Sequence, residues 1–434
     1  MTESPSRPEH TAVEVGLDCA SGGVVWLRTG RLFDGRGGSA RRDAHLVYDR
    51  EGFRYVGWDD QTPPRDVLRS GQHRPDVDLP GHVAIPGLTD AHAHLFLDGA
   101  ELDPERRRAH VQAGDRAMLE AAKRRLPSIV SGGVLAVRDA GDRHGVGLAL
   151  SRLERGASRP VMPYVDSPGA AIHRRGRYGA FMSGEAEAFD TLGDCVASRV
   201  ERGADRIKII ATGIIDFESG DVRGRPQFST KEIRDMVAAA RSFDRQTFAH
   251  ASGEDGIGRV VEGGVDSVEH GFFVSEDQLK QMRDRNVAWV PTFAPVQAQV
   301  DHAGVFGWDE GVLSNLRRIL ELHAERLRAA YAFGVKIVAG SDAGSPGVPH
   351  GSGLIYELAC MERAGMPFEA VIQSATGAAS GRFGFREGFG HLAKGFRSRF
   401  LLFNKKRFQS AADLRRPEFV VFDGGSVRGA DAQR

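Results

Sequence analysis

Six side chains able to bind divalent cations lie at or near the ends of short apolar runs in this 434-residue sequence. The first run ends in Asp90-Ala91-His92-Ala93-His94, and later runs carry Lys208, His250, His270 and Asp342. Imidazole nitrogens and carboxylate oxygens are the donors that Zn²⁺ and similar ions prefer. Each residue taken alone could equally be a hydrogen-bonded histidine or a turn aspartate, but their joint occurrence favours a metal centre.

The spacing of the first pair suits a strand. Residues i and i+2 of a strand point to the same side, so His92 and His94 can both face one site. Asp90 and Glu269 are candidates to accept hydrogen bonds from the ring N–H groups of metal-binding histidines. They are equally well explained as ordinary polar residues at turns.

Lys208 lies inside the apolar run RIKIIATG, where an ammonium group is costly to bury. It could extend to the rim of the fold or pair with Asp205. It could instead lose its proton, react with CO2 and become an N-carboxylate that bridges two cations. A bridged pair would lower the pKa of a shared water, and Asp342 could take that proton as general base and pass it to a leaving amine.

The elements that position these residues follow an alternating pattern. Short β-branched runs recur between helical segments, which is typical of βα units. Ser229 with Glu232, and Ser275 with Gln278, match the capping box that begins a helix. Eight units predict an α/β fold, a closed (β/α)8 TIM-like barrel. The eight runs are VAIPGLTDAHAHL, GVLAVRDAG, VMPYVDSPG, RIKIIATG, QTFAHASG, DSVEHG, AWVPTF and KIVAGSDAG.

Both ends of the chain have a different, strand-rich texture. We predict a disordered tail over residues 1–20 and the barrel over 83–390. Residues 21–82 and 391–434 should together form one small β-sandwich domain, because edge strands need partners.

The amino-acid composition narrows the classes of binding partner that the protein can have. Lys and Arg number 58, as do Asp and Glu, and this balance argues against a nucleic-acid or anionic-membrane surface. Three scattered cysteines predict neither disulfides nor a cysteine zinc site. No secretory or membrane segment is evident, so we expect a cytoplasmic protein with a small-molecule substrate. A homo-oligomer remains open.

The motifs IPGLTDAHAHL, GADRIKI, FAHASG, VDSVEHG and GSDAG, followed by GHLAKGFRSRFLLF, resemble the amidohydrolase superfamily over roughly residues 24–428. The resemblance is to its binuclear branch with a carboxylated lysine, which includes dipeptidase-like and imidazolonepropionase-like members. It implies two divalent cations, with Zn²⁺ expected. His92, His94 and Asp342 would bind the more buried ion, His250 and His270 the more exposed one, and Lys208 would bridge.

The loop SPGAAIHRRGRYGAF departs from the family pattern, because Gly176-Arg177-Tyr178-Gly179 stands where dipeptidase-like members have Gly-Gly-His-Gly. Tyr178 could still donate to a developing oxyanion, so it is a candidate catalytic residue with Asp342. His173, Arg177, Tyr178 and His350 are candidate substrate-binding residues. The cationic loop favours a substrate that bears a carboxylate.

The predicted function is hydrolysis of a C–N bond in an amide, dipeptide, N-acyl amino acid or cyclic amide. A lactone or ester hydrolase is an alternative, since the same hydroxide attacks esters. A mononuclear deaminase or imidazolone-type hydrolase is disfavoured by Lys208 and by Gly253, where deaminases usually have a glutamate. A scaffold without metals is disfavoured because all six ligands are present.

Overall fold

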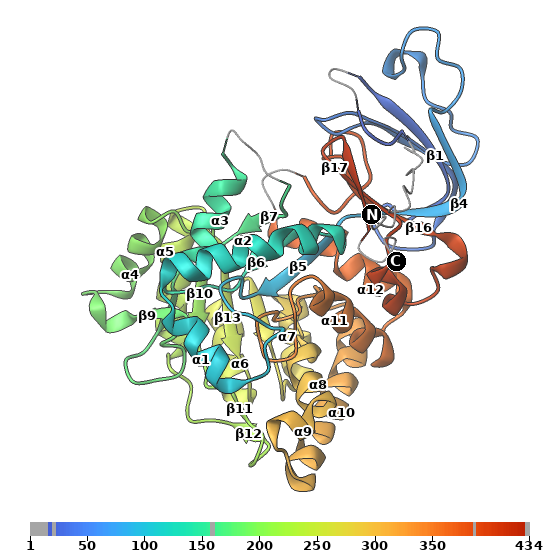
Figure 1. Ribbon diagram of the computed structural model, residues 1–434. Coiled ribbons are helices and arrows are strands. Elements are labelled where there is room, and N and C mark those ends of the chain that lie inside the picture. Colours follow the sequence, from blue (N-terminus) through green and yellow to red (C-terminus); the bar gives the residue numbers. More distant parts are fainter. Residues whose placement is uncertain (1–15, 20–22, 157–160, 385–387, 430–434) are drawn as a thin grey trace, which may run out of the picture.

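The computed structural model describes residues 16–19, 23–156, 161–384 and 388–429. Strands from the two ends of the chain form one sheet at the upper right of Figure 1, and helices surround a set of parallel strands below it. The architecture is therefore mixed α/β.

The first sheet has seven strands in the order β18-β17-β16-β4-β1-β2-β3. β4 pairs with β1 along one edge and with β16 along the other. The strands from the two ends of the chain therefore belong to one continuous sheet. Shared pairing on β4 joins the described strands into one sheet, and two separate facing sheets, as expected for a sandwich, are not shown. The strands are β1 (Val25–Leu32), β2 (Arg41–Tyr48), β3 (Phe53–Gly57), β4 (Val77–Pro86), β16 (Arg399–Asn404), β17 (Phe419–Phe422) and β18 (Gly425–Arg428).

Of the predicted tail over residues 1–20, residues 1–15 and residue 20 lie outside the described part of the chain. In its described part, Leu17 and Cys19 are buried in the core of the small sheet. The hydroxyl of Tyr48 donates to the carbonyl of Leu17, and the amide of Cys19 donates to that of Gly424. Residues 17 and 19 thus belong to the packed domain.

Parallel strands form two further sheets, with the orders β5-β6-β7 and β15-β14-β13-β10-β8-β9. Seven of the eight predicted runs contain one of these strands. β8 and β9 were not predicted. The strands are β5 (Leu88–Ala93), β6 (Val134–Asp139), β7 (Tyr164–Asp166), β8 (Ala171–His173), β9 (Ser183–Glu185), β10 (Ile207–Ile210), β13 (Thr247–Ala251), β14 (Ser267–His270) and β15 (Ala288–Val290).

The eighth run forms isolated bridges, with no strand assigned among its described residues. Ile337 bridges Trp289 of β15, and Ala343 bridges Ala93 of β5, both in parallel. Gly340 lies between them, where a Cβ atom would come within 2.8 Å of the His92 backbone nitrogen. Glycine therefore lets this segment lie close against β5 and join the two parallel sheets.

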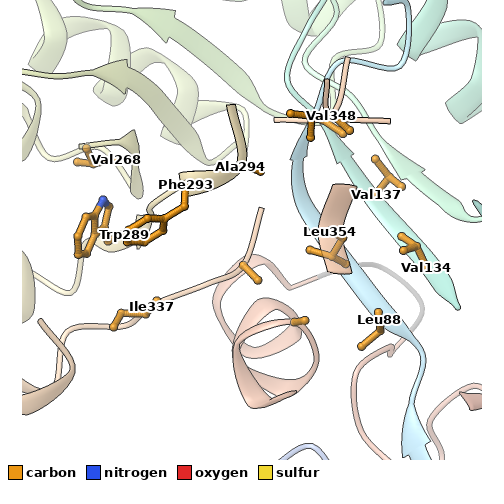
Figure 2. Close-up of a cluster of buried hydrophobic side chains, with 14 of the residues drawn as sticks. Leu88, Val134, Val137, Val268, Trp289, Phe293, Ala294, Ile337, Val348 and Leu354 are labelled. Carbon is orange, nitrogen blue, oxygen red and sulfur yellow. The ribbon is translucent and has the colours of Figure 1, made fainter. Parts of the chain in front are cut away.

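Helices pack on the outside of the parallel strands. Leu354 of α11 lies beside Leu88 and Val134 of neighbouring strands in Figure 2, and all three are buried in one cluster. Burying such a side chain contributes about 1.5–3 kcal/mol. The helices are α1 (Pro104–Gln112), α2 (Asp115–Ser131), α3 (Val146–Glu154), α4 (Leu192–Glu201), α5 (Thr230–Ser242), α6 (Glu254–Gly263), α7 (Glu276–Asp284), α8 (Phe293–Asp301), α9 (Ala303–Phe306), α10 (Glu310–Phe333), α11 (Ser352–Arg363), α12 (Phe368–Ser374) and α13 (Gly377–Phe383).

Both predicted capping boxes are confirmed, with Ser229 beginning α5 and Ser275 beginning α7. A short hairpin of β11 (Ile215–Asp216) and β12 (Asp221–Val222) follows β10. None of the helices in the described parts of the chain combines the length and apolarity that a membrane crossing requires.

Candidate metal centre

His92, His94 and Asp342 form a compact group of donors. One ligand atom from each lies within 4.8 Å of the others. The Nε2 atoms of His92 and His94 are 3.6 and 3.5 Å from Oδ1 of Asp342. Nε2 of His92 is buried with no hydrogen-bond partner among the described residues. An orphaned ring nitrogen facing a carboxylate is the arrangement that a bound cation would satisfy.

His250 and His270 extend this group. Their ring centroids are 4.6 Å apart, and the centroid of His270 is 4.9 Å from that of His92. His92 lies in β5 and His94 directly follows that strand, whereas His250 and His270 lie in β13 and β14, far away in the sequence. The four histidines make one continuous row of imidazoles.

Each imidazole uses one ring nitrogen in a hydrogen bond and leaves the other available. Nδ1 of His92 donates to Oε2 of Glu269 (2.6 Å), and Nδ1 of His94 donates to the carbonyl of Gly141 (3.1 Å). Nε2 of His250 donates to the carbonyl of Gly213 (3.1 Å). These acceptors place a lone pair on Nε2 of His92 and His94 and on Nδ1 of His250.

In His270, Nδ1 lies 2.8 Å from the hydroxyl of Thr292, which leaves Nε2 available. Burial lowers the pKa of all four rings, with neighbouring positive groups adding to the effect. All four are therefore neutral, which is the form that binds metal ions.

Two of the donors sit on left-handed backbone. φ is +66° at His270 and +55° at Asp342, and Thr292 has +51°. Residues other than glycine rarely adopt this region, which costs on the order of 1–3 kcal/mol per residue. Such strain clusters at functional sites, and it turns both donor residues abruptly at the ends of their segments.

Lys208 of β10 lines the same cavity as the four histidines. Its side chain is buried, with Nζ 4.6 Å from the ring centroid of Phe248 and no hydrogen-bond partner among the described residues. Burial lowers its pKa to about 8. It neither reaches the rim nor pairs with Asp205, which is bound to Arg155 instead.

The two acidic neighbours differ in what they contact. Glu269 accepts the hydrogen bond of the His92 ring, as expected. The expected contact of Asp90 with a ring nitrogen is wrong, because its carboxylate accepts from the amide and hydroxyl of Ser341 (2.9 and 2.5 Å) and from the amide of His92 (3.3 Å). Asp90 thus holds the segment that presents Asp342.

The sequence did not single out Arg138. This residue of β6 is fully buried and donates to the carbonyl of Ala91 (2.6 Å), to Oγ of Ser267 (3.0 Å) and to Oε2 of Glu269 (2.8 Å). Its hydrogen bonds link β5 and β14, the strands that carry His92 and His270. An arginine inside the apolar run GVLAVRDAG was the available signal, since a buried guanidinium must be paired.

The predicted ligands and Tyr178 surround a cavity of about 250 Å³. The ring centroid of Tyr178 is 5.4 Å from that of His250. Burial raises the pKa of Tyr178, so its hydroxyl remains protonated and can donate.

The other three candidate substrate-binding residues do not line this cavity. His173 is buried, and neither of its ring nitrogens has a hydrogen-bond partner in the described chain. Arg177 is exposed and donates to the carbonyl of Arg225. His350 lies behind the site, with Nε2 3.0 Å from the carbonyl oxygen of His94.

Comparison with known proteins identifies the family. Residues 83–427 match the amidohydrolase family, and the chain belongs to it. As a member, it is an enzyme that hydrolyses C–N bonds.

Individual relatives are distant. An ochratoxinase of Aspergillus niger is 25% identical over 431 residues, which cover 93% of this chain and 86% of that protein. An uncharacterized protein of Mycobacterium tuberculosis is 26% identical over 303 residues, covering 69% of this chain and 74% of that protein. A Xaa-Pro dipeptidase with bound methionine has the same fold, with a TM-score of 0.75 at 23% identity, covering 94% of this chain and all of the other.

Proposed function

We propose that the protein is a binuclear, metal-dependent hydrolase of small-molecule amides. The observation that carries this proposal is the set of four neutral imidazoles, Lys208 and Asp342 around one cavity. The substrate classes remain those with a C–N bond to cleave: an amide, a dipeptide, an N-acyl amino acid or a cyclic amide. Names among the similar structures, such as a dipeptidase and a phenylurea hydrolase, agree with C–N bond cleavage.

The proposed fold beneath this site is a closed (β/α)8 barrel. The segment 337–343 connects β15 to β5 by parallel bridges, which supports closure on that side. In such a barrel the carboxyl ends of the strands share one rim, which explains why donors from separate strands converge.

The donor set suits two cations such as Zn²⁺. His92, His94 and Asp342 would hold one, and His250 with His270 would hold the other. Lys208 would bridge them as an N-carboxylate, since an uncharged buried amine can react with CO2 and an anion between two cations removes its burial cost. When bound, the cations would lower the pKa of a shared water and polarise the scissile carbonyl.

The protein's own residues would then move the proton. Asp342 would accept the proton of the attacking water and deliver it to the leaving nitrogen. Ser345 donates to Oδ2 of Asp342 (3.0 Å) and fixes the orientation of that carboxylate. Tyr178 would donate to the oxygen on which negative charge develops.

Metal analysis combined with an amide hydrolysis assay tests this function. The protein is purified, loaded with Zn²⁺ in bicarbonate buffer, dialysed and measured for bound ions. We expect two ions per chain and hydrolysis that a chelator abolishes. One ion per chain would favour a mononuclear deaminase-type enzyme, and preferential cleavage of lactones or esters would favour that alternative. No bound ion and no turnover would refute the proposal.

A further inference from the structure

The cavity beside the candidate metal centre is largely apolar. Apart from the predicted ligands, its wall includes Phe181 and Met182 after β8, Ile214 and Phe217 of the hairpin region, Phe272, and Val296 of α8. Among the described residues that line it, the four histidines and Lys208 are the only basic side chains. A carboxylate placed against this wall would lose its hydration without gaining a cationic partner.

The arginines of the neighbouring loop are engaged elsewhere. Arg174 is paired with Glu187 and Glu232, and Arg175 with Glu185. Arg177 donates to a backbone carbonyl, as described above. These contacts engage the arginines of the loop outside the cavity, so they give no support to the carboxylate preference expected from the sequence.

One polar side chain in the apolar wall is poised to donate. Gln299 of α8 lines the cavity, and its Oε1 accepts the indole N–H of Trp308 (3.0 Å). This bond uses the acceptor end of the amide and leaves the Nε2 hydrogens for another partner. Gln299 lies seven residues beyond Thr292, the partner of His270, and therefore about 10 Å along the helix from Thr292.

We propose that the cavity selects uncharged substrates with an apolar body and excludes those with a carboxylate on that body. Gln299 binds a hydrogen-bond acceptor at the end remote from the scissile bond. The inference rests on the proposed function and narrows its substrate classes to uncharged amides and cyclic amides, because dipeptides and N-acyl amino acids carry a carboxylate. Gln299 is then a specificity-determining residue.

Three chromogenic substrates test the charge preference. The 4-nitroanilide of a short fatty acid is compared with the 3-carboxy-4-nitroanilide of the same acid and with the methyl ester of that carboxylate. We expect the neutral anilide and the ester to have kcat/KM values about 100-fold or more above that of the carboxylate. Equal or better hydrolysis of the carboxylate would overturn the inference. Low kcat/KM values for both the carboxylate and its methyl ester would also overturn it, because size and not charge would then decide.

A binding measurement separates this inference from the proposed function. If the protein binds no ion and hydrolyses none of the three compounds, the proposed function fails. Binding of the same compounds to metal-free Lys208→Met protein, measured by calorimetry, still tests the cavity. In this variant neither cations nor the lysine can attract the carboxylate. Tighter binding of the neutral compounds supports the inference, and equal binding refutes it.

Two substitutions test the residues. Val296→Arg should raise kcat/KM for the carboxylate at least about 10-fold, whereas Val305→Arg, at a position 61% exposed on α9, should not. Gln299→Leu should raise KM for the 4-nitroanilide without changing kcat and leave the anilide that lacks the nitro group unaffected. Equal effects on both anilides would reduce Gln299 to a structural role.

Discussion

Glu269 and His92 are joined by a hydrogen bond of 2.6 Å between two fully buried side chains. Glu269 also accepts from Arg138 (2.8 Å) and from the hydroxyl of Ser267 (2.6 Å). The carboxylate therefore fixes the Nδ1–H form of the ring and keeps Nε2 free. Its charge is balanced within the protein by the buried guanidinium.

Glu269→Gln should weaken cation binding about 10- to 100-fold, because an amide can neither accept as strongly from His92 nor balance Arg138. Competition with a chromophoric chelator measures the affinity, and circular dichroism checks folding. Glu262→Gln, on the exposed face of α6, is the matched control. Unchanged affinity in the folded variant would show that the histidine needs no such partner.

Lys208→Ala should abolish the bridging carboxylate and with it nearly all turnover. Short carboxylic acids should restore part of the activity, because they can occupy the space of the missing group. The wild-type protein in ¹³C-bicarbonate should show a carbamate carbon signal that the variant lacks. A wild-type protein that is fully active with two ions but shows no carbamate signal would contradict this role.

Much of the site was predictable because its donors lie in or directly after short apolar runs, which are the pattern of buried strands. His92, His94, His250 and His270 each follow or end an apolar run, and parallel strands bring such ends together. The amidohydrolase resemblance is confirmed by the family match. The carboxylated lysine stays a prediction.

Other parts were beyond sequence reasoning for physical reasons. β8 and β9 contain three residues each, too few to show a period. Arg177 belongs to a loop whose basic sequence suggested substrate binding. Its guanidinium instead donates to the backbone carbonyl of Arg225, a contact that no local sequence pattern predicts. Gln299 and Thr292 matter through tertiary contacts with Trp308 and His270, which no local pattern encodes.

Asp342→Asn should lower kcat about 10²- to 10⁴-fold, because an amide cannot accept the proton of the attacking water. His92 and His94 remain in place, so metal content should stay close to two ions per chain. Ser345→Ala, which removes only the hydrogen bond to Oδ2, should cost much less. Retained activity in the asparagine variant would refute the role of Asp342 as base.

Tyr178→Phe should lower kcat by about 100-fold without changing metal content, as expected for loss of one hydrogen-bond donor to a developing oxyanion. Steady-state kinetics and metal analysis of the same preparation measure both effects. Tyr356→Phe is the control, since the Tyr356 hydroxyl donates to Asp301 and lies outside the cavity. Equal rates in both variants would leave Tyr178 without a catalytic role.

Glu357 of α11 is fully buried, and its Oε2 accepts the amide hydrogen of Ala294 at the start of α8 (2.7 Å). Burial raises the pKa of Glu357 from its ordinary value of 4.5 to about 8. Between these two values the folded protein holds a proton that the unfolded chain has released. Its contribution to stability is therefore full at low pH and is lost as the pH rises to about 8.

Glu357→Gln should remove this dependence, because the amide stays uncharged at every pH. Urea unfolding of metal-free protein from pH 5 to pH 8.5 measures it. The free energy of unfolding of the wild type should fall relative to the variant by on the order of a few kcal/mol over this range. Glu362→Gln, at a partly exposed position on the same helix, should follow the wild type. Parallel curves for wild type and Glu357→Gln would mean that the carboxyl group ionises normally despite its burial.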